Sequence, residues 1–195
     1  MKIGVLALQG DFAEHVTALR KINIEPVEIR LPAQLEKVSG LILPGGESTT
    51  IGKLAVAYGL MEPLRSFAKV KPVWGTCAGA IFLSRDAKSD QPLLSVMNIT
   101  VKRNAFGAQV DSFEADLDIP EVINKGEDSS PIHAIFIRAP IIETIGGEAR
   151  VLARVSDGRI VAVRENNLLA TSFHPELTGD LRFHRYFAKM CTETD

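Results

Sequence analysis

The pentapeptide Gly75-Thr76-Cys77-Ala78-Gly79 is the sharpest chemical signal in this sequence. It lies between the apolar pair Val73-Trp74 and an apolar helical run, so it matches the G-x-S-x-G pattern of a nucleophile elbow with cysteine in place of serine. In such an elbow the next helix directs its N–H groups at the sulfur, which favours the thiolate. The alternative interpretation is a small buried cysteine at a tight strand–helix turn, because cysteine is among the most buried residue types.

A thiolate nucleophile needs a base, and the sequence offers the histidines His15, His133, His174 and His184. His174 stands out because it ends an apolar run and begins His174-Pro175-Glu176. A carboxylate two residues away can orient the imidazole and stabilise its cation, so Cys77, His174 and Glu176 are predicted to form a catalytic triad. The alternative for this tripeptide alone is a turn.

The other three histidines have simpler interpretations. His15 lies in an amphipathic helical pattern and His184 in a polar, basic one, so both are expected at the surface. His133 lies within an apolar strand pattern and is expected to be a core histidine with satisfied hydrogen bonds.

The loop Pro44-Gly45-Gly46-Glu47-Ser48 also follows an apolar run directly. Adjacent glycines leave backbone N–H groups open to an incoming oxygen, so the N–H groups of Gly46 and Ala78 are predicted to form an oxyanion hole. A phosphate cradle at a helix start is the alternative. We rank it lower because the Gly-Lys-Ser/Thr of a P-loop does not follow.

Metal and cofactor chemistry has little support in the sequence. No pair of Cys or His residues has zinc-ligand spacing, and His174 with Glu176 alone supplies too few ligands. The dinucleotide fingerprint G-x-G-x-x-G does not occur. We therefore expect no metal and no cofactor, and we interpret Cys191 as incidental.

Short apolar runs alternate with helical patterns in the first half of the chain. Strands are predicted at residues 3–8, 26–29, 40–43 and 73–74. Helices are predicted after Asp11 and Ser48, each as an N-cap, and over residues 78–83. Strands separated by helical crossovers indicate a parallel sheet with helices on both faces.

The second half has a different pattern. Strands are predicted at residues 98–102, 110–117, 132–137, 151–155, 160–163 and 168–173, with a hairpin turn at Asp157-Gly158 and a final helix over 181–190. The expected fold is an α/β three-layer sandwich with a mostly parallel central sheet and antiparallel additions in the second half. We expect residues 1–195 to form one domain.

Charge and cysteine content exclude several classes of protein. The 195 residues carry a net charge of −2 and a pI near 6.1, which does not fit binding to nucleic acid or an acidic membrane. Two cysteines do not make a disulfide framework and fit a reducing compartment. The apolar amino-terminal run is too short for a signal peptide or a membrane span, so a cytoplasmic protein is expected.

The longer motifs carry a family resemblance that covers essentially the whole chain. They are residues 4–10 with Glu14-His15, residues 44–50, 75–79, 103–107, 111–114, 136–140 and 173–177. Together they resemble the triad-type (class I) glutamine amidotransferases, and within these the glutaminase subunits of pyridoxal 5'-phosphate synthases. The resemblance implies a flavodoxin-like glutamine amidotransferase fold.

The resemblance also implies roles for individual residues. Cys77 would attack the side-chain amide of L-glutamine to form a thioester, and His174, held by Glu176, would protonate the departing ammonia and then activate water. The residues implied to contact glutamine are Gly46, Glu47, Ser48, Arg103, Ile137 and Arg138. A bidentate guanidinium suits an α-carboxylate.

The implied partner is the synthase subunit, in a hetero-oligomer. It would take up the ammonia to make pyridoxal 5'-phosphate, and docking would activate the glutaminase. Gln9-Gly10 and the helix carrying Glu14 and His15 are implied to face that subunit.

Several alternatives stay open at this point. The chain could serve another ammonia-using synthase, or be a γ-glutamyl hydrolase with the same triad. It could also be an elbow-cysteine hydrolase or stress protein, although these do not generally combine the elbow with a late His-Pro-Glu. A non-catalytic binding module is the remaining alternative, and the presence of all three triad residue types argues against it.

Overall fold

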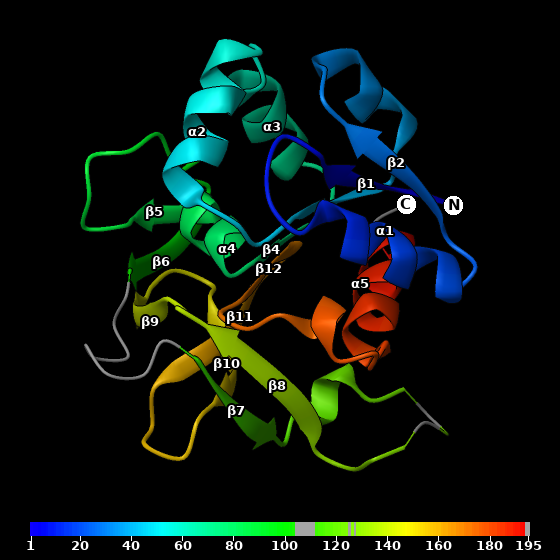
Figure 1. Ribbon diagram of the computed structural model, residues 1–195, viewed down its shortest axis with the longest axis vertical. Helices are drawn as coiled ribbons and strands as arrows, with labels where there is room; N and C mark the ends of the chain where they lie inside the picture. Colours follow the sequence, from blue (N-terminus) through cyan, green and yellow to red (C-terminus); the bar gives the residue numbers. More distant parts are fainter. Residues whose placement is uncertain (104–111, 125, 127, 194–195) are drawn as a thin grey trace.

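The computed structural model describes residues 1–103, 112–124, 126 and 128–193 (Figure 1). Its strands are β1 (Lys2–Leu6), β2 (Glu25–Ile29), β3 (Gly40–Leu43), β4 (Val73–Thr76), β5 (Ser84–Asp86), β6 (Met97–Lys102), β7 (Ser112–Leu117), β8 (Ile132–Ile137), β9 (Ile141–Ile145), β10 (Arg150–Arg154), β11 (Ile160–Glu165) and β12 (Leu168–Thr171). The α-helices are α1 (Phe12–Lys21), α2 (Ser48–Ala57), α3 (Met61–Ala68), α4 (Ala78–Leu83) and α5 (Arg182–Glu193). Short 3-10 turns are η1 (Pro32–Lys37), η2 (Pro120–Val122) and η3 (Pro175–Leu177).

The central sheet has ten strands, in the order β2-β1-β3-β4-β12-β11-β9-β6-β5, with β10 paired to β11. From β2 to β12 all neighbours are parallel, and this order is that of flavodoxin-like folds. Strands β3 and β4 are buried along their whole length, as expected for parallel strands covered on both faces. The predicted parallel α/β core is confirmed.

The antiparallel additions are also confirmed. β11 pairs antiparallel with β12, β10 and β9, and Asp157-Gly158 lies in the turn between β10 and β11. β7 and β8 form a separate two-stranded sheet beside the central one (Figure 1). Because only one face of this pair is covered, its residues alternate between buried and exposed.

Two apolar clusters cover opposite faces of the sheet. One contains buried residues of α2, α3 and α4, and the other contains residues of α1, α5 and β8 together with the fully buried Trp74. These two layers with the sheet between them make the predicted three-layer sandwich. None of the helices in the described part of the chain is long and apolar enough to cross a membrane.

One of the two predicted helix caps is wrong, and the other lacks a capping hydrogen bond. The N-cap of α2 is Glu47 and not Ser48, because the Glu47 carboxylate accepts the backbone N–H of Thr50 at 2.8 Å. Asp11 does occupy the N-cap position of α1, but its side chain makes no capping hydrogen bond. The sequence prediction also lacked α3, β5 and β9; Pro63 lies in the first turn of α3, where proline is tolerated.

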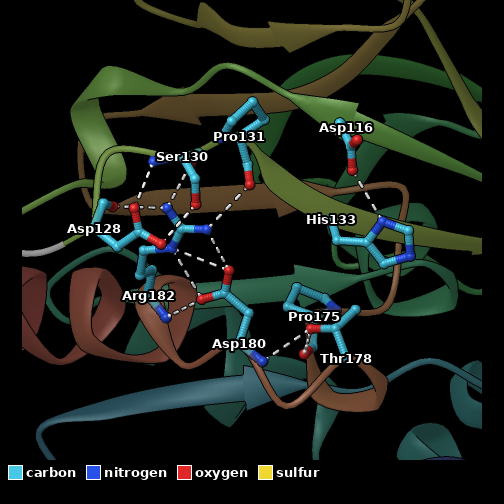
Figure 2. A network of polar contacts seen from close by, with 9 residues as sticks. All are labelled: Asp116, Asp128, Ser130, Pro131, His133, Pro175, Thr178, Asp180 and Arg182. Carbon is cyan, nitrogen blue, oxygen red and sulfur yellow. Dashed lines mark hydrogen bonds and ion pairs between the residues drawn. The ribbon is translucent and has the colours of Figure 1, made fainter.

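A buried ion pair fixes the start of α5. The Arg182 guanidinium contacts the Asp180 carboxylate at 2.6 Å and donates to the carbonyl oxygens of Asp128 and Ser130 at 2.9 and 2.6 Å (Figure 2). A buried guanidinium with several acceptors is held in one place by all of them. This network anchors α5 to the loop that leads into β8, and so fixes the helix residues that follow Arg182.

Candidate active site

Cys77 lies at a sharp turn between β4 and α4. Its backbone has φ +47° and ψ −105°, a conformation that residues other than glycine rarely adopt. The backbone N–H of Cys77 donates to the Thr171 carbonyl at 2.8 Å, which ties the turn to the end of β12. Such strain persists only where the surrounding structure enforces it, and it is typical of functional sites.

The two glycines of the elbow allow the helix to lie directly on the sheet. A Cβ on Gly79 would be 1.9 Å from the carbonyl oxygen of Leu43, and a Cβ on Gly75 would be 2.5 Å from the Gly79 carbonyl group. Neither contact involves a side chain that could rotate away. Close approach of α4 to β3 and β4 therefore requires glycine at both positions.

Replacing Gly79 with alanine is expected to destabilise the protein by about 3 kcal/mol, since overpacking typically costs 1–3 kcal/mol and backbone cannot yield easily. The helix-propensity gain of about 1 kcal/mol does not offset this cost. Thermal unfolding should show a fall in Tm of roughly 10 °C. Gly146→Ala is the matched control, because its Cβ would meet only the Asn98 carbonyl oxygen at 3.9 Å. Equal melting temperatures for the two variants would contradict the expectation.

Strand pairing brings His174 to Cys77. Thr76 and Thr171 are opposite each other in the parallel β4–β12 pair, so the chain leaves both strands at the same edge of the sheet. The His174 backbone N–H then donates to the Ile135 carbonyl of β8 at 2.9 Å. The two side chains come close enough for Cys77 to affect the pKa of His174.

Glu176, in η3, orients the imidazole. Its Oε1 lies 2.7 Å from Nδ1 of His174, and both side chains are buried. The Asp11 carboxylate is the next acidic group, with Oδ2 3.6 Å from the same Nδ1. A buried carboxylate on Nδ1 leaves the other ring nitrogen to exchange a proton with sulfur, as a nucleophile–base pair requires.

These contacts shift the proton affinity of His174. Burial alone would lower the pKa of His174, but the hydrogen bonds to Cys77 and Glu176 and their negative charges raise it to about 10. Burial raises the pKa of the Glu176 carboxyl, and the contact with His174 opposes that change. The raised pKa favours the imidazolium form of His174 at neutral pH.

The loop after β3 lies against the imidazole. A Cβ on Gly45 would be 2.4 Å from Cε1 of His174, so the backbone itself forms this wall. Gly46 has φ +145°, and the loop is held because Gln9 Oε1 accepts the N–H of Glu47 at 2.7 Å. Ala78 begins α4 directly after Cys77. The predicted oxyanion-hole residues thus follow two neighbouring strands at the same edge of the sheet.

Arg103 connects the predicted substrate residues to one another. Its guanidinium contacts Glu47 Oε1 at 2.8 Å and donates to the Thr49 hydroxyl at 2.9 Å. The amide oxygen of Gln91 accepts from Arg103, Thr49 and Ser48 at 3.2, 2.9 and 3.1 Å. Burial would raise the pKa of Glu47, but hydrogen bonds from Thr50 and the Arg103 charge lower it. Sequence reasoning missed Gln91, because nothing in the sequence near it marks a site.

Ile137 is the last residue of β8, beside the elbow, and Arg138 follows it. The Ile137 carbonyl oxygen is 4.0 Å from the Cys77 sulfur, and Arg138 is exposed with φ +43°. A second non-glycine residue in the left-handed region marks another strained turn at this edge. Residues 104–107 of the predicted Arg-Asn-Ala-Phe-Gly motif lie outside the described residues.

The comparison with protein-family models decides the family. The model of the SNO glutamine amidotransferase family matches residues 5–193. The chain belongs to the SNO glutamine amidotransferase family. The implied membership in the glutamine amidotransferases is therefore confirmed, and the open alternative of an elbow-cysteine stress protein is excluded.

Several relatives match this chain at high sequence identity over nearly their full length. A Moorella thermoacetica protein named pyridoxal 5'-phosphate synthase subunit PdxT is 58% identical over 192 residues, covering 97% of this chain and 99% of that protein. A protein of the same name from Roseiflexus castenholzii is 53% identical, covering 97% and 100%. A solved structure described as a glutamine amidotransferase has a TM-score of 0.90 at 47% identity and covers 97% of this chain and 98% of its own.

The structure shows that three sequence predictions about the histidines of this SNO family chain are wrong. His15 and His184 are fully buried against each other, not at the surface. His133 is exposed, not in the core, and lies between Asp116 and Glu114 at 3.0 Å from each (Figure 2 shows the Asp116 contact). The placement follows from the packing: His133 is on the open face of the β7–β8 pair, whereas His15 lies on the buried side of α1.

One grouping of ligand atoms in the described part of this SNO family chain could hold a metal ion. Asp11, His174 and Glu176 have ligand atoms within 4.8 Å of one another. The His174 nitrogen near both carboxylates is Nδ1, which already holds Glu176. An ion there would replace the His174–Glu176 hydrogen bond, so this grouping fits proton transfer better than metal binding.

Proposed function

We propose that this chain is a glutaminase that hydrolyses L-glutamine to L-glutamate and ammonia and delivers the ammonia to the synthase subunit of a pyridoxal 5'-phosphate synthase. The close relatives named as subunits of that synthase support the assignment. We propose that residues 1–195 act as one glutaminase domain in the cytoplasm, where free thiols stay reduced. The observation that carries the proposal is the buried series Cys77–His174–Glu176 at the end of parallel strands.

Each step of the mechanism uses a group in this series. The Cys77 thiolate attacks the side-chain carbonyl carbon of glutamine, forming a carbon–sulfur bond and an oxyanion. N–H groups of Gly46 and Ala78 stabilise that oxyanion, each by on the order of 3 kcal/mol. The His174 imidazolium then gives its proton to the amide nitrogen, the carbon–nitrogen bond breaks, and ammonia leaves a γ-glutamyl thioester.

Hydrolysis of the thioester restores the enzyme. Neutral His174 takes a proton from water as the water oxygen attacks the thioester carbon. The carbon–sulfur bond breaks, glutamate forms, and the sulfur departs as the thiolate beside the new imidazolium. Throughout both halves Glu176 holds the same nitrogen of His174, so the other nitrogen always faces the reacting atoms.

The glutamine itself is held by groups around the elbow. We assign its contacts to Gly46, Glu47 and Ser48 of the loop after β3, to Arg103, and to Ile137 and Arg138 at the end of β8. The links of Arg103 to Glu47 and Thr49 support a common binding surface. Negative Glu47 suits an ammonium group and the arginines suit a carboxylate, which are the two ends of an amino acid.

Replacing Arg103 with alanine is expected to raise KM for glutamine about tenfold, the equivalent of roughly 1.4 kcal/mol of binding. The kcat should change little, because Arg103 contacts neither Cys77 nor His174 in the described hydrogen bonds. Steady-state kinetics on the complex would measure both. Arg154→Ala is the matched control, since Arg154 is exposed and donates to the Gly158 carbonyl. A loss confined to kcat would contradict the binding role.

An ammonia-release assay on glutamine tests the function as a whole. The chain is measured alone, with the synthase subunit, and with a different ammonia-using synthase subunit as control. Ammonia release that rises on adding the pyridoxal 5'-phosphate synthase subunit supports the proposal. No hydrolysis in its presence, or equal activation by the control subunit, would overturn it.

A further inference from the structure

The Glu176 carboxylate has a second oxygen that the mechanism above does not use. Oε1 holds His174, whereas Oε2 is buried and has no hydrogen-bond partner among the described residues. Nε2 of His15 lies 3.4 Å from this oxygen. Leaving a buried carboxylate oxygen without a hydrogen-bond donor costs free energy. It therefore matters whether Nε2 of His15 carries a proton that faces this oxygen.

Hydrogen bonding determines where that proton is. His15 Nδ1 lies 3.0 Å from Nε2 of His184, and His15 Nε2 lies 3.2 Å from the Thr76 hydroxyl. If His15 carried its proton on Nδ1, its bare Nε2 would face the carboxylate, and the buried Nδ1–H of His184 would have no acceptor among the described residues. With the proton on Nε2, His15 faces Thr76 and Glu176 as a donor, and His184 donates to it.

The surroundings keep both rings neutral and fixed. Burial lowers the pKa of His184 to about 3, and burial, the electrostatic interaction with His184 and the charge of His174 lower the pKa of His15. Trp74 contacts both rings edge-on, with centroids 5.6 Å from His15 and 5.1 Å from His184. A neutral donor stabilises the carboxylate without competing with the His174 cation for it.

We infer that His15, oriented by His184, is a positioning residue that holds the Glu176 carboxylate through its Nε2–H, so that the other carboxylate oxygen stays on His174. The groups that face Glu176 are then His174, His15 and, at longer range, Asp11. Asp180 is the charged group that acts on His184. This inference rests on the proposed function for its activity measurement only.

The test compares two replacements of His15 in the complex with the synthase subunit. His15→Leu removes the donor, whereas His15→Gln keeps an N–H donor at the place of Nε2. We expect kcat to fall about 10- to 100-fold in H15L, because the buried carboxylate oxygen then has no donor group facing it, with KM for glutamine unchanged. H15Q should recover kcat to within about threefold of the parent. His133→Leu is the matched control, because His133 is exposed and contacts two carboxylates outside the site.

The rate of Cys77 alkylation by iodoacetamide at one fixed pH gives a second measurement that needs neither glutamine nor the partner. Loss of the Glu176 orientation weakens the support of the His174 cation for the sulfur nucleophile, so alkylation should be slower in H15L and recover in H15Q. If H15L does not fold, the pair His184→Leu and His184→Gln replaces it, with the same direction expected. Parent-like kcat and alkylation in a folded H15L or H184L, or equal losses in the Leu and Gln variants, would overturn the inference. Failure of the parent complex to release ammonia would instead reject the proposed function, and the alkylation result would still stand.

Discussion

Replacing Cys77 with alanine is expected to reduce glutamine hydrolysis by the complex at least about 10⁴-fold, since no thioester can then form. The change removes one sulfur atom from a buried position, so the fold and docking to the synthase subunit should persist. Ammonia release measures the first effect, and co-elution of the two subunits measures the second.

Cys191→Ala is the control for this experiment. Cys191 is also buried and is not joined in a disulfide, but it packs in the apolar cluster of α5 and away from the elbow. Its replacement should leave hydrolysis unchanged. In the parent chain a glutamine-like electrophile should label Cys77 and spare Cys191. Equal labelling of both thiols, or hydrolysis that survives C77A, would reject the thioester mechanism.

Replacing Glu176 with glutamine is expected to lower kcat by roughly 10⁴-fold, the size associated with loss of the orienting carboxylate in a triad. The amide has no charge to support the His174 cation, so the pKa of His174 should fall from about 10. An amide NH₂ facing Nδ1 also fixes the imidazole with its proton on Nε2, where it cannot accept one from sulfur. Single-turnover ammonia release separates this effect from binding.

Glu36→Gln is the matched control, because Glu36 is an exposed carboxylate in η1. It should retain the activity of the parent. Cys77 alkylation gives an independent check on E176Q, since its rate at a fixed pH should fall once the His174 cation is lost. An E176Q variant with parent-like kcat would show that the carboxylate is not needed to orient His174.

Local patterns were enough to predict the elements that position the site. The elbow was predictable because Gly75 and Gly79 are needed wherever a helix contacts a strand this closely, which leaves a visible spacing. The glutamine amidotransferase resemblance followed from contiguous motifs. The proximity of Cys77 and His174 could also be anticipated, since parallel strands end at the same edge of a sheet.

The misplaced histidines show where local patterns fail. His184 lies with Phe183 and Phe187 on the buried side of α5, a helical spacing visible in the sequence but outweighed by the polar neighbours. His133 interrupts an apolar run, and only the pairing of β7 with β8 away from the central sheet shows that its side of the strand is open. A polar residue in an apolar run does not by itself indicate which face is covered.

The sequence by itself determined the nucleophile candidate, the base with its carboxylate, the alternating α/β order and the family, because each is encoded within a few consecutive residues. Only the tertiary structure decided that His15 and His184 lie behind Glu176, that Gln91 joins Arg103 to Ser48, and that Asp11 faces His174 and makes no capping hydrogen bond. These contacts join residues that are 12 to 169 positions apart. Their geometry depends on how strands pair and helices pack, which no local spacing records.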